Sequence, residues 1–341
     1  KKAIEESGCE FINISLGPDL PIQDDTVNAW TIGLDQLAFE RQVFITVAAG
    51  NNGQADPKSG AARIEAPADG VNAVTIGAAD RTGSDWARAP YSAIGPGRSP
   101  ALIKPDFTAF GGSEEEYFRV LTPGASIVVG NQMGTSFASP YFLRSAVALR
   151  VWGGSRLTRL TIKALLVHGA ERGDRDSKEV GWGRVPVFNP LDPIPKDRPW
   201  IYQGQMTSGN FVRIELPWPN SDLGDTVSLK ATFCYLPPVA SHDPLTYTQA
   251  ALYIRFVPDL SAPVNSQGHP PSHPFFDLDG GELNQDQDAE AILWAPVKSN
   301  QNAFPKEFLK APGFEIRYVD RSLADGEGPP PVDYSLVVTA T

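Results

Sequence analysis

Cysteine, histidine and long apolar runs are all scarce in this sequence of 341 residues. Its two cysteines, Cys9 and Cys234, fall in different halves of the chain, which argues against a disulfide framework and favours a reducing, cytoplasmic compartment. No apolar run approaches the roughly 20 residues that span a bilayer, so we expect no membrane partner. Positive charge is in deficit, because 29 Lys and Arg stand against 40 Asp and Glu. The resulting net charge of −11 argues against nucleic acid as a partner.

Strands alternate with helices in the first part of the chain. Apolar runs predict strands at 11–17, 43–49 and 73–79, and amphipathic patterns predict helices at 25–42, 136–152 and 158–171. The first of these helices places Trp30, Leu34 and Leu37 on one face. Such alternation is typical of a sheet covered by helices on both faces, so we expect a doubly wound, mostly parallel α/β domain over residues 1–190.

The pattern changes near residue 190. A proline-rich stretch at 189–199 predicts a linker. Beyond it the hydrophobic period becomes two, which predicts strands at 211–216, 227–235, 251–257, 290–294, 314–319 and 334–339. Short strands without intervening helices suggest an all-β domain, an antiparallel sandwich or jelly roll, over residues 191–341. No motif in this second domain indicates a function.

The most informative motif lies at 134–140 and reads GTSFASP. Gly134 allows a sharp turn because it has no Cβ, and Ser136 follows at the start of an amphipathic helix. A helix N-terminus presents unpaired N–H groups and the positive end of its dipole, which favour a developing negative charge. We expect Pro140 in the first helical turn, where a missing N–H removes no hydrogen bond. The motif is typical of a mounted nucleophile, and a serine N-cap before an ordinary core helix is the alternative.

Two apolar strands add to this pattern. The segment at 44–53 reads FITVAAGNNG, the segment at 11–17 reads FINISLG, and both end in small residues. Together with the Ser136 motif they resemble the subtilases, the subtilisin-like serine endopeptidases. The resemblance continues in the family's order through 65–68, 72–78, 91–96, 104–106 and 181–185, so that it covers roughly residues 1–190.

The resemblance implies a role for each matching residue. Ser136 is expected to attack the scissile carbonyl of a peptide or protein substrate and form an acyl-enzyme. Asn51 and the Ser136 backbone N–H are expected to donate to the oxyanion, although Asn51 in a simple turn is an alternative. The family's substrate-binding edge corresponds to Ser15, Leu16 and Gly17, and one wall of its pocket for the P1 side chain corresponds to Ala48, Ala49 and Gly50. No metal ligand is implied.

The family's two other catalytic residues have no match. Subtilases place Asp and then His before Ser, upstream of the strand that here is 11–17. Only residues 1–10 precede that strand, and they begin as a charged amphipathic helix rather than a signal peptide. All four histidines follow Ser136, and they are His168, His242, His269 and His273. We therefore expect an N-terminally incomplete catalytic domain, with the missing Asp and His segment as a partner and little activity from this chain alone.

His168 and two acidic loops allow further interpretations. His168 lies in a helical pattern, where a packed or capping imidazole is favoured over a catalytic one. Four aspartates could hold calcium through hard oxygen ligands, and they are Asp277, Asp279, Asp286 and Asp288. Their spacing does not fit an EF-hand, which favours a solvated loop. The acidic run at 114–116 could contact basic residues of a substrate, although a solvated surface is the commoner use of such a run.

Three functions remain open from the sequence. The first is a subtilisin-like serine endopeptidase that works through an acyl-enzyme on Ser136 and of which this chain is a fragment. The second is a natural pseudoprotease that binds peptides without cleaving them. The third is an α/β-hydrolase or esterase, which is disfavoured because no Gly-x-Ser-x-Gly elbow surrounds Ser136.

Overall fold

A four-stranded parallel sheet forms the centre of the N-terminal part. The computed structural model describes residues 2–122, 127–186, 199–217, 224–240, 246–276, 293–321 and 330–341. The strands lie in chain order and are β1 (Phe11–Ile14), β2 (Phe44–Ala48), β3 (Val74–Ala79) and β4 (Phe107–Phe110). Each neighbouring pair is parallel, which confirms the parallel sheet predicted for this part of the chain.

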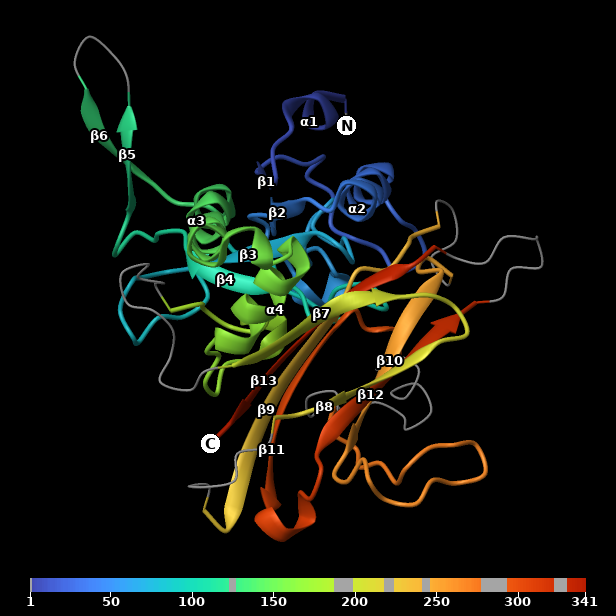
Figure 1. Ribbon diagram of the computed structural model, residues 1–341. Helices are drawn as coiled ribbons and strands as arrows, with labels where there is room; N and C mark the ends of the chain where they lie inside the picture. Colours follow the sequence, from blue (N-terminus) through green and yellow to red (C-terminus); the bar gives the residue numbers. More distant parts are fainter. Residues whose placement is uncertain are drawn as a thin grey trace.

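Helices pack against both faces of this sheet (Figure 1). The helices are α1 (Lys2–Ser7), α2 (Ala29–Arg41), α3 (Thr135–Gly153), α4 (Arg159–Gly169) and α5 (Ser177–Val180). Successive residues of a strand point to opposite faces. Accordingly, Phe44 of β2 packs with Phe142 of α3, whereas Ile45 packs with Leu37 of α2. Helix α3 crosses the sheet and contacts all four strands, which fixes its N-terminus relative to the strand ends.

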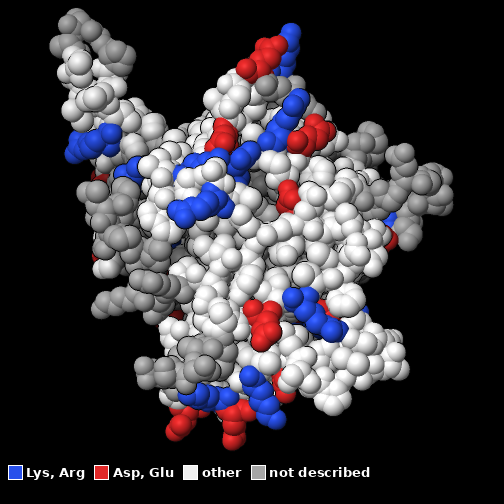
Figure 2. All heavy atoms as spheres, in the orientation of Figure 1, with Lys and Arg blue, Asp and Glu red and all other residues white. Residues whose placement is uncertain are grey.

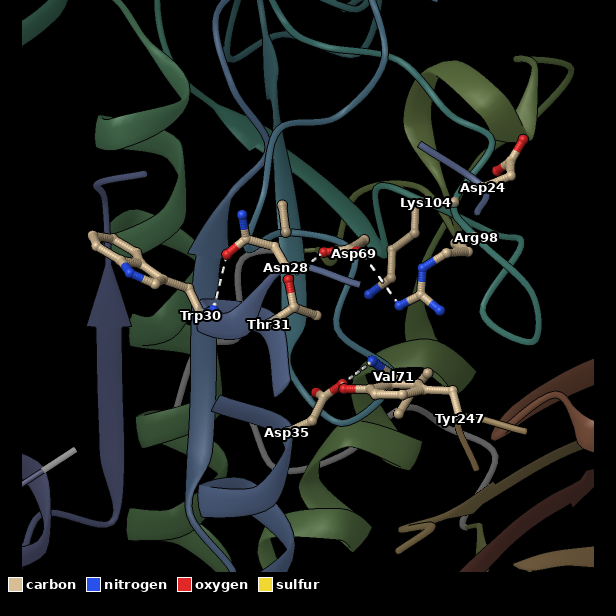
Figure 3. Close-up of polar contacts among 12 residues, drawn as sticks. Asp24, Asn28, Trp30, Thr31, Asp35, Asp69, Val71, Arg98, Lys104 and Tyr247 are labelled. Carbon is tan, nitrogen blue, oxygen red and sulfur yellow. Dashed lines mark hydrogen bonds and ion pairs between the residues drawn. The ribbon is translucent and has the colours of Figure 1, made fainter. Parts of the chain in front are cut away.

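The α2 helix is shorter than the sequence predicts and its buried face is partly polar. It begins after Asn28, whose side chain caps it by accepting a hydrogen bond from the Trp30 N–H at 2.9 Å (Figure 3). Trp30 itself is 49% exposed, so the apolar face predicted for this helix does not extend to its first turn. Thr31 and Asp35 are instead fully buried beside Leu37.

An antiparallel hairpin that the sequence analysis did not predict precedes α3. It consists of β5 (Phe118–Thr122) and β6 (Val128–Gln132), and it projects away from the rest of the molecule in Figure 1. Phe118 anchors its base, because its ring stacks on Phe137 of α3 at 5.4 Å. Farther out, Leu121 and Val129 are 73% and 60% exposed, so the hairpin presents apolar side chains to solvent.

The C-terminal part contains two antiparallel sheets. One has the order β10-β12-β8 and the other β11-β9-β13-β7. Their strands are β7 (Trp200–Met206), β8 (Phe211–Glu215), β9 (Thr226–Tyr235), β10 (Ala250–Val257), β11 (Val297–Pro305), β12 (Gly313–Asp320) and β13 (Val332–Ala340). Side chains from both sheets share one hydrophobic core, with Phe256 and Phe314 from the first and Phe233 and Leu336 from the second.

Most of the predicted strands of this part are present, with three differences. The sequence analysis missed β7 and β11. The strand predicted at 290–294 is wrong for Leu293 and Trp294, which lie outside every strand, and its other residues fall outside the described part. Residues 189–198 of the predicted linker, and all four aspartates proposed for calcium, also lie outside the described residues.

Close packing joins the two parts. Helix α4 lies against β9 and β13, where Leu160 and Ala164 form a small core with Cys234 and Val337.

On the face shown in Figure 2, Lys and Arg side chains are interspersed with Asp and Glu among the visible described residues. The net charge of −11 is therefore not gathered into one acidic patch on that face.

Candidate active site

The start of α3 places Ser136 at a helix N-terminus, as the motif predicts. The preceding Gly134 has φ 154° and ψ 154°, a conformation that residues with a Cβ rarely adopt. Thr135 is fully buried and Ser136 is half-buried. The next turns carry Ala138 and Phe142 into the core, so the helix is held rigidly behind the serine. Among the described residues, none accepts or donates a hydrogen bond with the Ser136 hydroxyl.

Pro140 lies in the second turn of α3, which corrects the prediction that it would lie in the first. Residue 140 would normally donate its N–H to the carbonyl of residue 136, and proline has no N–H. The Ser136 carbonyl instead accepts a hydrogen bond from the Ser15 hydroxyl at 3.1 Å. Proline at this position therefore leaves the Ser136 carbonyl free to connect the first turn of α3 to the segment after β1.

Asn51 lies beside the first turn of α3. Its Oδ1 accepts hydrogen bonds from the Thr135 N–H at 3.0 Å and the Thr135 hydroxyl at 3.1 Å. Because Oδ1 faces these donors, the Nδ2 amide group points to the other side of the carboxamide. Nδ2 donates no hydrogen bond to any described residue, and Asn51 is exposed. Among the described residues, a side-chain N–H donor is therefore unused on the residue that bonds Thr135, the neighbour of Ser136.

The two segments predicted to bind substrate each contact this turn through one residue, Ser15 in the first and Gly50 in the second. Ser15 reaches Ser136 directly, and on the other side Gly50 N donates to the Thr135 hydroxyl at 3.3 Å. Gly17 packs so closely that a Cβ would lie 2.5 Å from the Ala66 carbonyl oxygen. Leu16 is 63% exposed, whereas Ala49 is fully buried. The segments that contain Ser15, Leu16 and Gly17 and Ala48, Ala49 and Gly50 therefore both meet the nucleophile turn.

Glu65 is a site residue whose role the sequence analysis did not assign. Gly50 has φ 114°, and a Cβ there would lie 2.6–2.7 Å from the Glu65 carboxyl group. The Glu65 N–H donates to the Ala49 carbonyl at 2.9 Å. Burial, and secondarily the charge of Asp19, raise the pKa of Glu65 above its ordinary value. A half-buried carboxyl group thus lies against the segment predicted to form the P1 wall.

Comparison with protein families accounts for this arrangement. The model of the subtilase family matches residues 1–183. The chain belongs to the subtilase family. Its Ser136 and Asn51 are the positions at which the resemblance expects the subtilase nucleophile and oxyanion donor, and they lie on the α/β part of the molecule that the family match covers.

Individual relatives of this subtilase are distant. The uncharacterized protein y4bN of Sinorhizobium fredii (strain NBRC 101917 / NGR234) is 29% identical over 220 residues, with 49% of each chain covered. The self-cleaved protease domain of PatA is 23% identical with a TM-score of 0.42, over 55% of this chain and 62% of that one. Sphericase is 20% identical with a TM-score of 0.40, over 55% and 60% of the two chains. The chain spans about half the length of the curated relative that it matches.

The histidines of this subtilase that the structure describes all bond away from Ser136. His168 is buried, and its two ring nitrogens bond the hydroxyls of Thr232 at 3.0 Å and Thr339 at 3.1 Å. Desolvation lowers the pKa of His168 to about 3. His269 bonds Glu315, and His273 bonds the carbonyl of the next residue. His242 lies outside the described residues.

Other motifs of the subtilase part are structural. Glu115 forms an ion pair with Arg81 at 2.7 Å and Glu116 accepts from Thr82, so these two acids of the run at 114–116 hold a loop. In the motif at 104–106, the Lys104 ammonium forms a buried ion pair with Asp106.

Both cysteines are free. Within the described ranges, no cluster of three metal-ligating acids, histidines or cysteines occurs. No helix there is long and apolar enough to cross a bilayer.

Proposed function

We propose that this chain carries the nucleophile and oxyanion-binding half of a subtilisin-like serine endopeptidase site. Ser136 attacks the scissile carbonyl, and the acyl group is then transferred to water. The Asn51 Nδ2 and the Ser136 backbone N–H donate to the oxyanion of the tetrahedral intermediate. Ser15, Leu16 and Gly17 pair with the substrate backbone, and Ala48, Ala49 and Gly50 line the P1 pocket. This reaction requires no cofactor.

The position of Asn51 carries this proposal. A turn asparagine typically bonds the backbone of its own turn, whereas Asn51 bonds Thr135, which is distant in the chain. An oxyanion donor must likewise be oriented before the reaction. Two hydrogen bonds from Thr135 fix the acceptor end of Asn51, and its donor end has no partner among the described residues. Thr135 directly precedes Ser136, so the same turn that mounts the nucleophile also orients the donor.

The general base and its carboxylate partner come, in this proposal, from a segment that is not among these residues. The described histidines are bonded elsewhere, and the nearest candidate by sequence, His168, is held neutral within the core. Strand β1 pairs with β2 on one side only, within the described sheet. Its open edge and the apolar hairpin β5–β6 are surfaces that such a segment can cover.

Residues 191–341 are proposed to form an appended β-sandwich domain.

Labelling with a fluorophosphonate tests this division of the site. The chain alone is expected to react slowly, because its serine hydroxyl lacks a base. A longer protein that includes the upstream coding sequence is expected to react rapidly at Ser136 and to cleave unfolded polypeptides, and the Ser136→Ala variant of it is expected to do neither. Rapid stoichiometric labelling of the present chain would show that a base lies within it.

A pseudoprotease is the second candidate, favoured by the same absence of a bonded base among the described residues. A pseudoprotease would use the same proposed substrate-binding edge as the endopeptidase and would differ only in that it does not cleave the bound peptide. A longer protein that binds peptides but neither cleaves them nor labels at Ser136 would establish this alternative.

A further inference from the structure

Glu65 occupies a position that no structural role accounts for. Its carboxyl group is half-buried, and among the described residues it has no ion-pair partner and no side-chain hydrogen bond. A carboxylate removed from water without a partner is costly, and here the neighbouring Asp19 adds a second negative charge. Carboxyl groups of this kind cluster at functional sites, where a ligand can supply the missing partner.

The backbone around Glu65 places this carboxyl between the two segments proposed to hold substrate. Glu65 N donates to Ala49 O at 2.9 Å, which joins it to the P1 wall. The next residue, Ala66, lies against Gly17 of the substrate edge. Only glycine fits at position 50, because a Cβ would overlap the Glu65 carboxyl group. The carboxyl therefore takes the space that a side chain on the wall would otherwise fill.

The Glu65 side chain is only half-buried, so a long side chain of a ligand can reach its carboxyl group from solvent. A P1 side chain that reaches Glu65 must bring a hydrogen-bond donor or a positive charge, because an apolar group would leave the carboxylate unpaired. Lysine and arginine fulfil both requirements, and arginine can bind in a bidentate manner.

We propose that Glu65 lies at the base of the P1 pocket and selects substrates with lysine or arginine at P1. This inference rests on the proposed function, since it uses the same substrate edge and wall. Glu65 acts on specificity, and the reaction at Ser136 does not involve it. Glu65 of this chain thus provides the negative charge that a cationic P1 side chain requires.

Peptide binding to the chain itself tests this proposal without catalysis. The probes are fluorescein-labelled peptides of one sequence that differ at a single position, which holds Lys, Arg, Leu or Glu. Fluorescence anisotropy is expected to show at least about tenfold tighter binding of the Lys and Arg peptides. Glu65→Gln is expected to weaken their binding on the order of 30-fold and to leave the Leu peptide unchanged. Glu65→Lys is expected to favour the Glu peptide.

Two controls separate specificity from folding. Asp174→Asn removes an equal charge from an exposed position of the same part and is expected to leave every affinity unchanged. Glu65→Gln is expected to keep or raise the midpoint of urea denaturation, because it removes an unpaired half-buried charge. Equal binding of the Lys and Leu peptides, failure of all four peptides to bind, or a preference that survives Glu65→Gln would overturn the proposal.

The outcome for Glu65 is separable from the outcome for the proposed function. Mass spectrometry of the cleaved peptides shows the P1 preference of the longer protein. If that protein cleaves through Ser136 without any preference at P1, only the role of Glu65 is overturned. Conversely, a Glu65-dependent preference for Lys in binding, without cleavage by the longer protein, supports the P1 proposal and overturns only the endopeptidase.

Discussion

The oxygen and the nitrogen of the Asn51 carboxamide have different roles, one structural and one proposed for catalysis. Its Oδ1 accepts from the Thr135 N–H, whereas its Nδ2, which has no partner among the described residues, is the proposed oxyanion donor. In the longer, active protein, Asn51→Ala is expected to lower kcat by about 10²–10³ with a smaller change in KM, because the lost donor acts on charge that develops only in the transition state. Steady-state kinetics on one peptide measures both constants.

A second variant distinguishes the donor from the acceptor. Asn51→Asp keeps an oxygen for Thr135 but has no donor, so it is expected to lose at least as much kcat as Asn51→Ala while retaining more stability. Activity of Asn51→Asp close to that of the natural protein would assign Asn51 a turn role only.

The carbonyl of Ser136 allows a second prediction at the scale of single residues. Ser15→Ala leaves this carbonyl without its donor, and we expect a loss of about 1 kcal/mol in the free energy of unfolding. In the double variant with Pro140→Ala, residue 140 regains an N–H that can bond the same carbonyl. The double variant is therefore expected to be more stable than the sum of the single changes, which a double-mutant cycle by urea denaturation measures. Additive effects would contradict the replacement of one donor by the other.

The sequence predicted where Ser136 and Asn51 lie but not how Glu65 and Pro140 act. A motif with fixed spacing places the nucleophile because the turn, helix and strand end are all local. Glu65 faces Gly50 only after segments far apart in the chain have paired, and this pairing leaves no period in the sequence. Gly50, at the end of the predicted wall, was the one signal in the sequence, because glycine can mark a place where another group approaches the backbone closely.

Helix α4 depends on a neutral imidazole, and this makes its packing sensitive to pH. The buried ring of His168 bridges the hydroxyls of Thr232 and Thr339 on β9 and β13. Its pKa in the folded chain is about 3, below the ordinary 6.5. The unfolded chain therefore binds the extra proton between these values, so stability falls as the pH drops through that window.

Because of this shift, we expect the free energy of unfolding to be about 2 kcal/mol lower at pH 5 than at pH 7.5. The loss amounts to about 1.4 kcal/mol for each pH unit below 6.5. Urea denaturation at the two pH values measures the loss. His168→Gln is expected to be less stable at pH 7.5 but to show a smaller fall with pH. Replacement of the exposed His273 by Gln keeps the natural response. An unchanged pH response in His168→Gln would show that His168 does not titrate in this way.

The elements that the sequence predicted are those with strong local patterns. The buried strands β2 and β3 and the amphipathic α3 and α4 have continuous or periodic apolar residues. By contrast, β7 reads WIYQGQM and β11 reads VKSNQNAFP, and both lie at the edges of one sheet with many polar residues. Their composition does not predict a strand, and they become strands through backbone hydrogen bonds, β7 with β13 and β11 with β9.

At the scale of the whole molecule, hydrogen bonds tie the two parts together through Asp35 (Figure 3). Asp35 of α2 accepts from the backbone N–H groups of Val71 and Asn72 at 2.8 and 2.9 Å. It also accepts from the hydroxyl of Tyr247 in the C-terminal part at 2.9 Å. The Asn72 amide extends this junction to the Pro237 carbonyl at 3.1 Å. The helix after β1 is thereby coupled to residues more than half the chain away.

This junction predicts that the two parts unfold together. Tyr247→Phe removes one buried donor to Asp35 and is expected to lower the free energy of unfolding by about 1–3 kcal/mol. Pulsed hydrogen exchange with mass spectrometry, across a urea series, reports β2 and β9 separately. Both strands are expected to lose protection at one midpoint, which Tyr247→Phe shifts equally in the two, because neither part can open without breaking the bonds to Asp35. Tyr253→Phe, at a position 39% exposed, provides the matched control and is expected to move neither midpoint. If Tyr247→Phe shifted β9 alone, the C-terminal part would be an autonomous unit, and the stability of the Ser136 site would not depend on it.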